Sequence, residues 1–158
     1  MSNTQKSVSE HRVFVVRALE RVEMGEMTTN VLKDAPVDTH GLCQEIVFGV
    51  QRWKGSLDKM IQSNVKRSPK AWVRRLLYMA LYELYFLEKP SHAVINEAVE
   101  LCKQSKYKAQ ANFVNAVLSD LPNSYSSLIN KSNVSGVLTF LSPTYLSRFF
   151  LGLLLIWY

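Results

Sequence analysis

The chemistry that the sequence offers most clearly is positive charge, concentrated between residues 52 and 75. This segment holds eight basic residues and one acid, Asp58, for a local net charge of +7, whereas the whole chain carries +6. Such a basic segment attracts the phosphates of nucleic acid first and an anionic membrane surface second; a solvated basic face without a ligand is the other interpretation. The eight basic residues are Arg52, Lys54, Lys59, Lys66, Arg67, Lys70, Arg74 and Arg75.

Catalytic and metal-binding patterns are missing from the sequence. It contains no dinucleotide-binding glycine motif, no P-loop, no G-x-S-x-G motif and no H-E-x-x-H motif. Cys43 and Cys102 are far apart and lie among apolar residues at helical spacing, which is typical of reduced core cysteines. His11, His40 and His92 stand near expected helix starts without neighbours at ligand spacing. We therefore expect binding rather than enzymatic activity, with no catalytic residue, metal or cofactor in this chain.

Apolar spacing predicts helices along most of the chain, because no alternation typical of strands persists. The expected helix from Ala71 to Lys89 is apolar on nearly every face, so we place it at the centre of a bundle. Ser91 is the expected cap of the helix that follows. The predicted fold class is an all-α bundle of about six helices with a central buried helix. The expected helices span about Val8–Met24, Thr28–Lys33, His40–Asn64, Ala71–Lys89, His92–Gln104 and residues 111–121.

Two glycines in the longest expected helix are unusual, since each costs about 1 kcal/mol relative to alanine. A glycine permits the close approach of another helix or of a ligand. Helix packing is the favoured interpretation for Gly49, whereas packing and ligand approach are equally favoured for Gly55. Trp53 lies on the apolar stripe, so core packing is favoured over base stacking. Trp72 begins a helix near the basic segment and fits either role.

Residues 121–158 differ in composition from the rest, and we predict a domain of residues 1–120 followed by a linker and a hydrophobic tail. The last ten residues, FFLGLLLIWY, carry no charge, but a helix of that length spans about 15 Å, half of a hydrocarbon core. A membrane anchor is therefore less favoured than a buried terminal helix or an aberrant end. The first residues, MSNTQKSVSEHR, lack the apolar stretch of a secretory signal, so we expect a cytoplasmic protein.

Three segments, in this order and spacing, resemble a known family. They are RVFVVRALERVEMGEMTTNVL at residues 12–32, QEIVFGVQRWKGSLDKMI at residues 44–61, and the run from LLYMALYELYFLEK to NFVNAVL at residues 76–118. Together they resemble the NusB-like helical domain. They are more similar to the version at the N-terminus of bacterial 16S rRNA cytosine-5 methyltransferases of the RsmB (Sun/Fmu) type than to free-standing NusB. The resemblance covers about residues 8–120.

The resemblance implies an all-helical domain that binds RNA. In free-standing NusB an arginine-rich N-terminal segment contributes to RNA contact, and the matching segment here holds Arg12, Arg17 and Arg21 with three glutamates nearby. The resemblance therefore adds Arg12 and Arg17 to the candidate RNA-binding residues. In the methyltransferases a second domain binds S-adenosylmethionine and carries two catalytic cysteines. That domain is absent here, so we expect a truncated or frame-disrupted member.

Three functions are compatible with these observations. The first is an RNA-binding module for 16S rRNA, in which the basic residues contact phosphates and the arginines pair or stack with exposed bases. The second is a NusB-type antitermination factor that binds leader RNA with a ribosomal protein, although the weak arginine cluster and the pattern at residues 47–58 count against it. The third is a non-catalytic protein-interaction domain.

Overall fold

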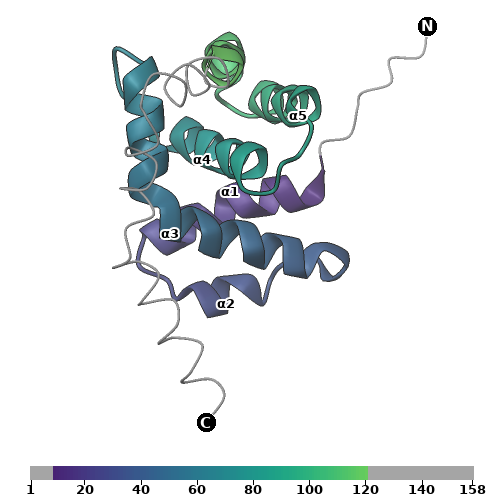
Figure 1. The fold of residues 1–158 in the computed structure, drawn as a ribbon. Helices are drawn as coiled ribbons and strands as arrows, with labels where there is room; N and C mark the ends of the chain where they lie inside the picture. The colour runs from purple at the N-terminus through teal and green to yellow at the C-terminus, as the bar shows by residue number, and fades with distance from the viewer. Residues whose placement is uncertain (1–8, 121–158) are drawn as a thin grey trace, which may run out of the picture. The chain divides into compact units, whose positions relative to one another are not determined.

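Helices form the regular secondary structure of residues 9–120, the part of the chain that the computed structural model describes (Figure 1). No strand occurs in this range, so the predicted all-α bundle is confirmed. The predicted linker and tail over residues 121–158 lie outside the described residues. The elements are α1 (Glu10–Glu23), α2 (Thr28–Leu32), η1 (Val37–Thr39), α3 (His40–Asn64), α4 (Ala71–Tyr85), α5 (Ser91–Gln104), η2 (Lys108–Gln110) and a helix over residues 111–120.

Helix α4 lies at the centre of the bundle, with α1, α3 and α5 packed against it (Figure 1). Every residue from 75 to 83 is buried. A helix that is apolar on all faces is stable only when other helices surround it, and α4 meets that requirement. The predicted central buried helix is therefore confirmed.

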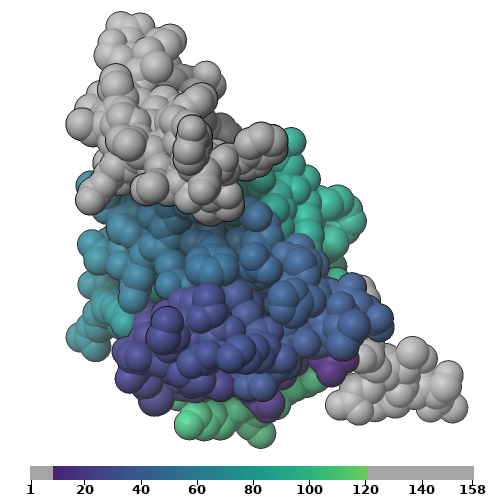
Figure 2. Space-filling view, turned by 90° about the horizontal axis from the view of Figure 1, so that it is seen from below, coloured from purple at the N-terminus to yellow at the C-terminus, as the bar shows by residue number. Residues whose placement is uncertain are grey.

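Helix α2 closes the side of the bundle opposite the helix over residues 111–120 (Figure 1). It is short, and it buries Val31 and Leu32 while it contacts α1 and α3. Figure 2 shows this side, where α1, α2 and the start of α3 form the surface in purple and blue. The later part of α3 leads away from α2 to the loop that joins it to α4 (Figure 1).

Several predicted helix boundaries differ from the structure. Helix α1 begins at Glu10 and ends at Glu23 rather than Met24, and α2 ends at Leu32 rather than Lys33. Helix α4 ends at Tyr85 rather than Lys89, because the chain turns at Glu88, whose φ of 49° lies in the left-handed region. The Lys89 N–H then donates to the carbonyl of Glu83 at 3.1 Å. Ser91 is the first residue of α5 and not its cap, since Pro90 occupies the cap position and no side-chain cap hydrogen bond forms. Helix α3 spans the predicted residues.

Helices α3 and α4 approach each other closely at Gly49. A Cβ atom at this position would overlap the ring of Tyr82, so the packing interpretation of Gly49 is confirmed. The Tyr82 hydroxyl donates to Glu45 at 2.6 Å, and burial together with this hydrogen bond raises the pKa of Tyr82 to about 12. A Cβ atom at Gly55 would meet nothing within 4 Å, so packing does not explain Gly55.

The two glycines make a matched pair for a stability test. We expect Gly49→Ala to lower the free energy of unfolding by about 1 to 3 kcal/mol, because the tyrosine ring must move to admit the methyl group. Gly55→Ala is expected to raise it by about 0.5 to 1 kcal/mol, since alanine restricts the unfolded chain and costs no contact. Urea unfolding followed by circular dichroism measures both. Shifts of equal sign in the two variants would contradict this account.

Candidate nucleic-acid interface

The loop between α3 and α4 presents three exposed cations, Lys66, Arg67 and Lys70. The loop is not helical, because Pro69 lacks a backbone N–H and disfavours helical conformation in the residue before it. The chain leaves α3 in an extended conformation at Val65. Within residues 9–120, Lys66 and Arg67 have no carboxylate partner.

Three further cations of the candidate set lie on the helices that flank this loop. Arg52 and Lys59 are exposed on α3, and because they are seven residues apart they lie on one side of that helix, two turns from each other. Arg74 on α4 is half-buried, and its Nε has no hydrogen-bond partner among the described residues. We call the following set the basic corner: Arg52, Lys59, Lys66, Arg67, Lys70 and Arg74.

Lys54 and Arg75 belong instead to an ion-pair network that joins α1, α3 and α4. Lys54 Nζ lies 3.0 Å from Glu23, and Arg75 pairs with Glu23 at 2.9 Å and also with Glu20. Burial by itself raises the pKa of Glu23, but the hydrogen bonds from Lys54 and Arg75 outweigh it and lower the pKa. The side chain of Arg75 is 6% exposed.

Arg75 lies in the interior and not on the surface, so its contact with RNA stays a prediction. Successive residues of a helix point about 100° apart, so neighbouring arginines reach different surroundings. Arg75 is turned towards the glutamates of α1, whereas Arg74 pairs with no carboxylate among the described residues. The sequence pattern treats the two as equivalent, and the structure separates them. Lys54 remains half-exposed and stays a predicted RNA contact.

Arg12 is also an interior residue, and contact between its side chain and RNA likewise stays a prediction. Its side chain is 5% exposed, and its Nε and Nη2 donate to the two oxygens of Glu83 at 2.8 and 3.0 Å. The third guanidinium nitrogen donates to Glu97 of α5. Arg12 therefore holds α1 against both α4 and α5. In this arrangement its guanidinium is occupied by carboxylates and does not face solvent.

Glu83 is the fully buried partner in this cluster. Lys89 Nζ donates to it at 2.6 Å, and the ring of His11 lies 3.9 Å away. Burial alone raises the pKa of Glu83, but His11, Lys89 and Arg12 outweigh that effect and lower the pKa to about 2. The carboxylate is thus ionised throughout the physiological pH range and acts as a structural anchor.

The other two N-terminal arginines differ from Arg12. Arg21 lies 2.6 Å from Glu26 and 2.7 Å from Asp34, so its guanidinium is also engaged by carboxylates. Arg17 is exposed and has no carboxylate partner within residues 9–120. Of the N-terminal candidates, Arg17 therefore keeps the surface position that RNA contact requires.

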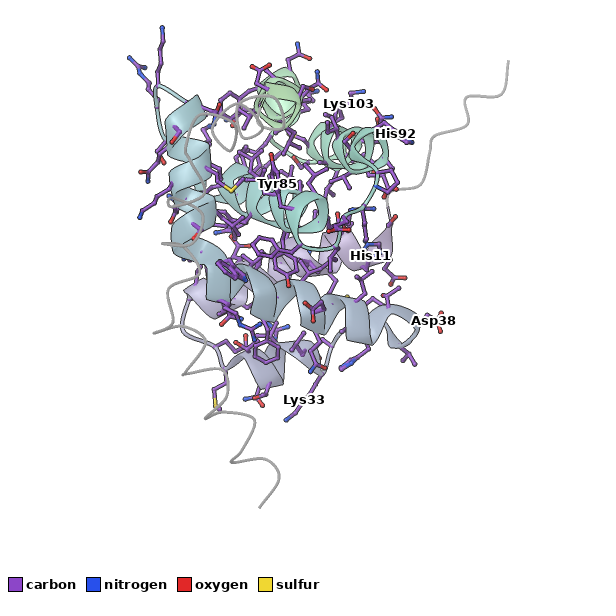
Figure 3. All side chains as sticks on the ribbon, in the orientation of Figure 1. His11, Lys33, Asp38, Tyr85, His92 and Lys103 are labelled. Carbon is purple, nitrogen blue, oxygen red and sulfur yellow. The ribbon has the colours of Figure 1, made fainter. Side chains whose placement is uncertain are left out.

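A stacked aromatic pair lies beside the loop and brings in a second basic segment. The rings of Trp72 and Tyr107 are stacked, with centroids 5.1 Å apart and planes inclined by 23°. Lys70 Nζ lies 5.7 Å from the centroid of Tyr107, and Lys106 Nζ lies 5.4 Å from the same centroid. The lysines of residues 103–108 are visible in the sequence, but their proximity to the loop depends on how α4 and α5 pack. Figure 3 shows Lys103, near the end of α5, on the far side of the bundle from Lys33 and Asp38.

The remaining predicted residues are structural. Trp53 is half-buried, and its ring lies 4.9 Å from that of Phe86, which agrees with core packing. Cys43 and Cys102 are free and buried, and burial raises the pKa of both thiols. The prediction that both cysteines lie in the core is therefore confirmed.

Neither a metal site nor a membrane span occurs in the part of the chain that is described. No three His, Cys, Asp or Glu side chains in residues 9–120 are grouped to hold a metal ion. None of the helices in this range combines the length and the apolar character needed to cross a bilayer.

Comparisons with known proteins agree on one family. The family model described as "NusB family" matches residues 9–122. The chain is similar to the probable ribosomal RNA small subunit methyltransferase B of Bacillus subtilis, with 35% identity over 117 residues that cover 68% of this chain and 26% of that protein. It is also similar to ribosomal RNA small subunit methyltransferase B of Shewanella oneidensis, with 32% identity over 110 residues, 68% of this chain and 25% of that protein. The chain thus spans about a quarter of the length of these curated relatives.

A solved structure has the same fold. The T. maritima NusB structure matches with a TM-score of 0.64 and 20% identity, over 77% of this chain and 92% of that one. At this identity the match establishes the arrangement of the helices.

Proposed function

This chain belongs to the NusB family, and from that membership we propose that it binds small-subunit ribosomal RNA through the basic corner. The observation that carries the proposal is the loop between α3 and α4, where exposed Lys66 and Arg67 have no carboxylate partner in the described range. Some other surface cations, such as Arg21 and Lys54, are paired with carboxylates. The unpaired positive charge of Lys66 and Arg67 on this loop is complementary to a phosphate backbone.

The relatives support two parts of the proposal: the class of RNA that is bound, and the role assigned to the residues that match. These relatives are proteins named ribosomal RNA small subunit methyltransferase B, and they match this chain over about a quarter of their length. We assign recognition of the RNA to the matched residues, because they are the part of these proteins that belongs to the NusB family. S-adenosylmethionine and the methyl-transfer chemistry would belong to the part of such proteins that this chain does not cover.

The corner can engage RNA in two ways. Lysine and arginine contact phosphates and release the counterions condensed around them, so binding weakens as salt concentration rises. Arginine can in addition pair with or stack on bases that a single-stranded loop exposes, which gives sequence preference. Arg67 and the half-buried Arg74, whose Nε has no partner within the described residues, are suited to the second role.

We expect the full chain to bind a fragment of 16S rRNA with a salt dependence that corresponds to about four or more phosphates. Arg67→Glu should weaken binding about tenfold and reduce the slope of log affinity against log salt by about 1. Lys33→Glu is the matched control, because it changes the charge equally at the residue that follows α2, away from the loop in Figure 3. Fluorescence anisotropy at several salt concentrations measures both variants.

Two results would contradict the proposal. Equal losses in Arg67→Glu and Lys33→Glu would mean that net charge, and not the corner, governs affinity. Weak binding of the unmodified chain with a flat salt dependence would mean that the corner is a solvated face.

A further inference from the structure

We propose that Lys70 and Lys106, held beside the ring of Tyr107, form a second phosphate-binding site for single-stranded RNA, continuous with the basic corner. The inference rests on the proposed function and extends the RNA footprint from the α3–α4 loop to the turn after α5. It assigns a ligand to Lys106 and the neighbouring Lys108, which the charge pattern of residues 52–75 does not include.

The geometry brings two ammonium groups to one ring. Lys70 Nζ and Lys106 Nζ lie 5.7 and 5.4 Å from the centroid of Tyr107, so they are no further apart than the sum of these distances. The electron-rich face of a tyrosine attracts a cation, and Trp72 stacks on the ring and fixes its place. Two ammonium groups at one ring raise the local positive potential, which attracts the phosphates of a strand that passes over it.

No carboxylate lies close in the sequence to Lys70 or Lys106 that could neutralise their charge in place of a phosphate. No aspartate or glutamate occurs from residue 59 to residue 82 or from residue 101 to residue 119. Lys106 and Lys108 are exposed, and neither has an ion pair within residues 9–120. Lys103 is different, because it lies 3.4 Å from Glu100 on the same helix. The positive charge at residues 106 and 108 is therefore uncompensated, while that at residue 103 is neutralised.

The arrangement favours a nucleic-acid strand over an acidic peptide. The cations of the loop and of the turn flank a stacked aromatic pair, and single-stranded nucleic acid is bound by surfaces that combine cations with aromatic rings. Lysine binds phosphate as a flexible point charge, which suits a backbone contact without base selection. A strand that contacts Arg67 could pass Lys70 and reach Lys106 along one face.

The test compares four single substitutions in the full chain, titrated with a single-stranded 16S rRNA fragment at several salt concentrations. We expect Lys106→Glu to weaken binding about five- to tenfold and to reduce the salt slope by about 1. Lys103→Glu, three residues away with the same charge change, should alter affinity less than about twofold, since its charge is already paired. Tyr107→Leu should weaken binding less than Lys106→Glu, whereas Tyr107→Phe should bind as the unmodified chain does.

The outcomes separate this inference from the proposed function. If Arg67→Glu weakens binding but Lys106→Glu matches Lys103→Glu, the second site is overturned and the basic corner stands. If the unmodified chain shows no salt-dependent binding, both fail. If polyglutamate competes for the chain as well as the RNA fragment does, the site is a general polyanion surface and the RNA assignment is overturned. Thermal unfolding of each variant shows that the protein titrated is folded.

Discussion

Replacing Glu83 with glutamine is expected to lower the free energy of unfolding by about 3 to 5 kcal/mol at neutral pH. Glu83 is fully buried and receives two hydrogen bonds from Arg12 and one from Lys89. Without the charge of Glu83, the buried guanidinium of Arg12 keeps Glu97 as its remaining carboxylate partner, and an undercompensated buried charge is costly. Urea unfolding followed by circular dichroism measures the change.

The control for this prediction is Glu100→Gln on α5. Glu100 pairs with Lys103 at 3.4 Å on an exposed helix face, and exposed pairs of this kind contribute less than about 1 kcal/mol. We therefore expect the control to stay close to the unmodified protein. A loss below about 1 kcal/mol in Glu83→Gln would show that the cluster is not a structural anchor.

The lowered pKa of Glu83 predicts how the difference in stability between the unmodified protein and Glu83→Gln changes with pH. The partners of Glu83 hold its pKa at about 2 in the folded protein, against an ordinary value of 4.5. The unfolded chain takes up this proton first, so the stability contributed by Glu83 is present above about pH 4.5 and is lost as pH falls towards 2. The gap in stability between the unmodified protein and Glu83→Gln should therefore narrow over that range by about 3 kcal/mol. A gap that stays constant would contradict the pKa assignment.

Much of the fold could be predicted from the sequence because it follows from apolar spacing. The ends of α3 are as predicted, and α4 is central because a helix apolar on all faces has no stable exposed position. The end of α4 could not be predicted in this way. The residues after Tyr85 are compatible with a helix, and the turn at Glu88 depends on Lys89 reaching back to Glu83.

The candidate site was predictable only in part, because charge composition does not reveal which cations are already paired. Arg12 and Arg75 satisfy the charge pattern, yet both bind carboxylates from helices distant in the sequence. One signal was present. Arg12 stands at helical spacing from Val15 and Leu19, on the apolar stripe of α1. Glu83 stands within the apolar run of α4, and a buried acid requires a buried cation.

No comparable signal in the sequence indicates the contact between the α3–α4 loop and the turn after α5. Lys70 and Lys106 are distant in the sequence, yet both lie over the ring of Tyr107, on which Trp72 stacks. That contact is set by the way α4 and α5 pack, which neither periodicity nor charge counting determines. The sequence shows the lysines at residues 103–108. It does not show that they lie on the same surface as the basic corner.

Replacing Arg75 with methionine is expected to lower the free energy of unfolding by about 2 to 3 kcal/mol and to leave the RNA affinity of the folded protein unchanged. The side chain is 6% exposed and pairs with Glu20 and Glu23. The expected cost is smaller than for Glu83, because the glutamates left behind are 40% and 26% exposed and can regain water. Methionine fills most of the vacated space.

For Arg67→Met we expect the opposite result. Comparison of Arg75→Met with Arg67→Met shows which of the two arginines stabilises the fold and which binds RNA. Arg67→Met removes an exposed arginine with no carboxylate partner among the described residues, so stability should change by less than about 0.5 kcal/mol while RNA affinity falls several-fold. Urea unfolding and anisotropy titration are applied to both variants. If Arg75→Met keeps its stability but loses RNA affinity, the ion pairs with α1 open when RNA binds, and Arg75 returns to the interface. If it loses stability alone, Arg75 joins helices and the basic corner binds without it.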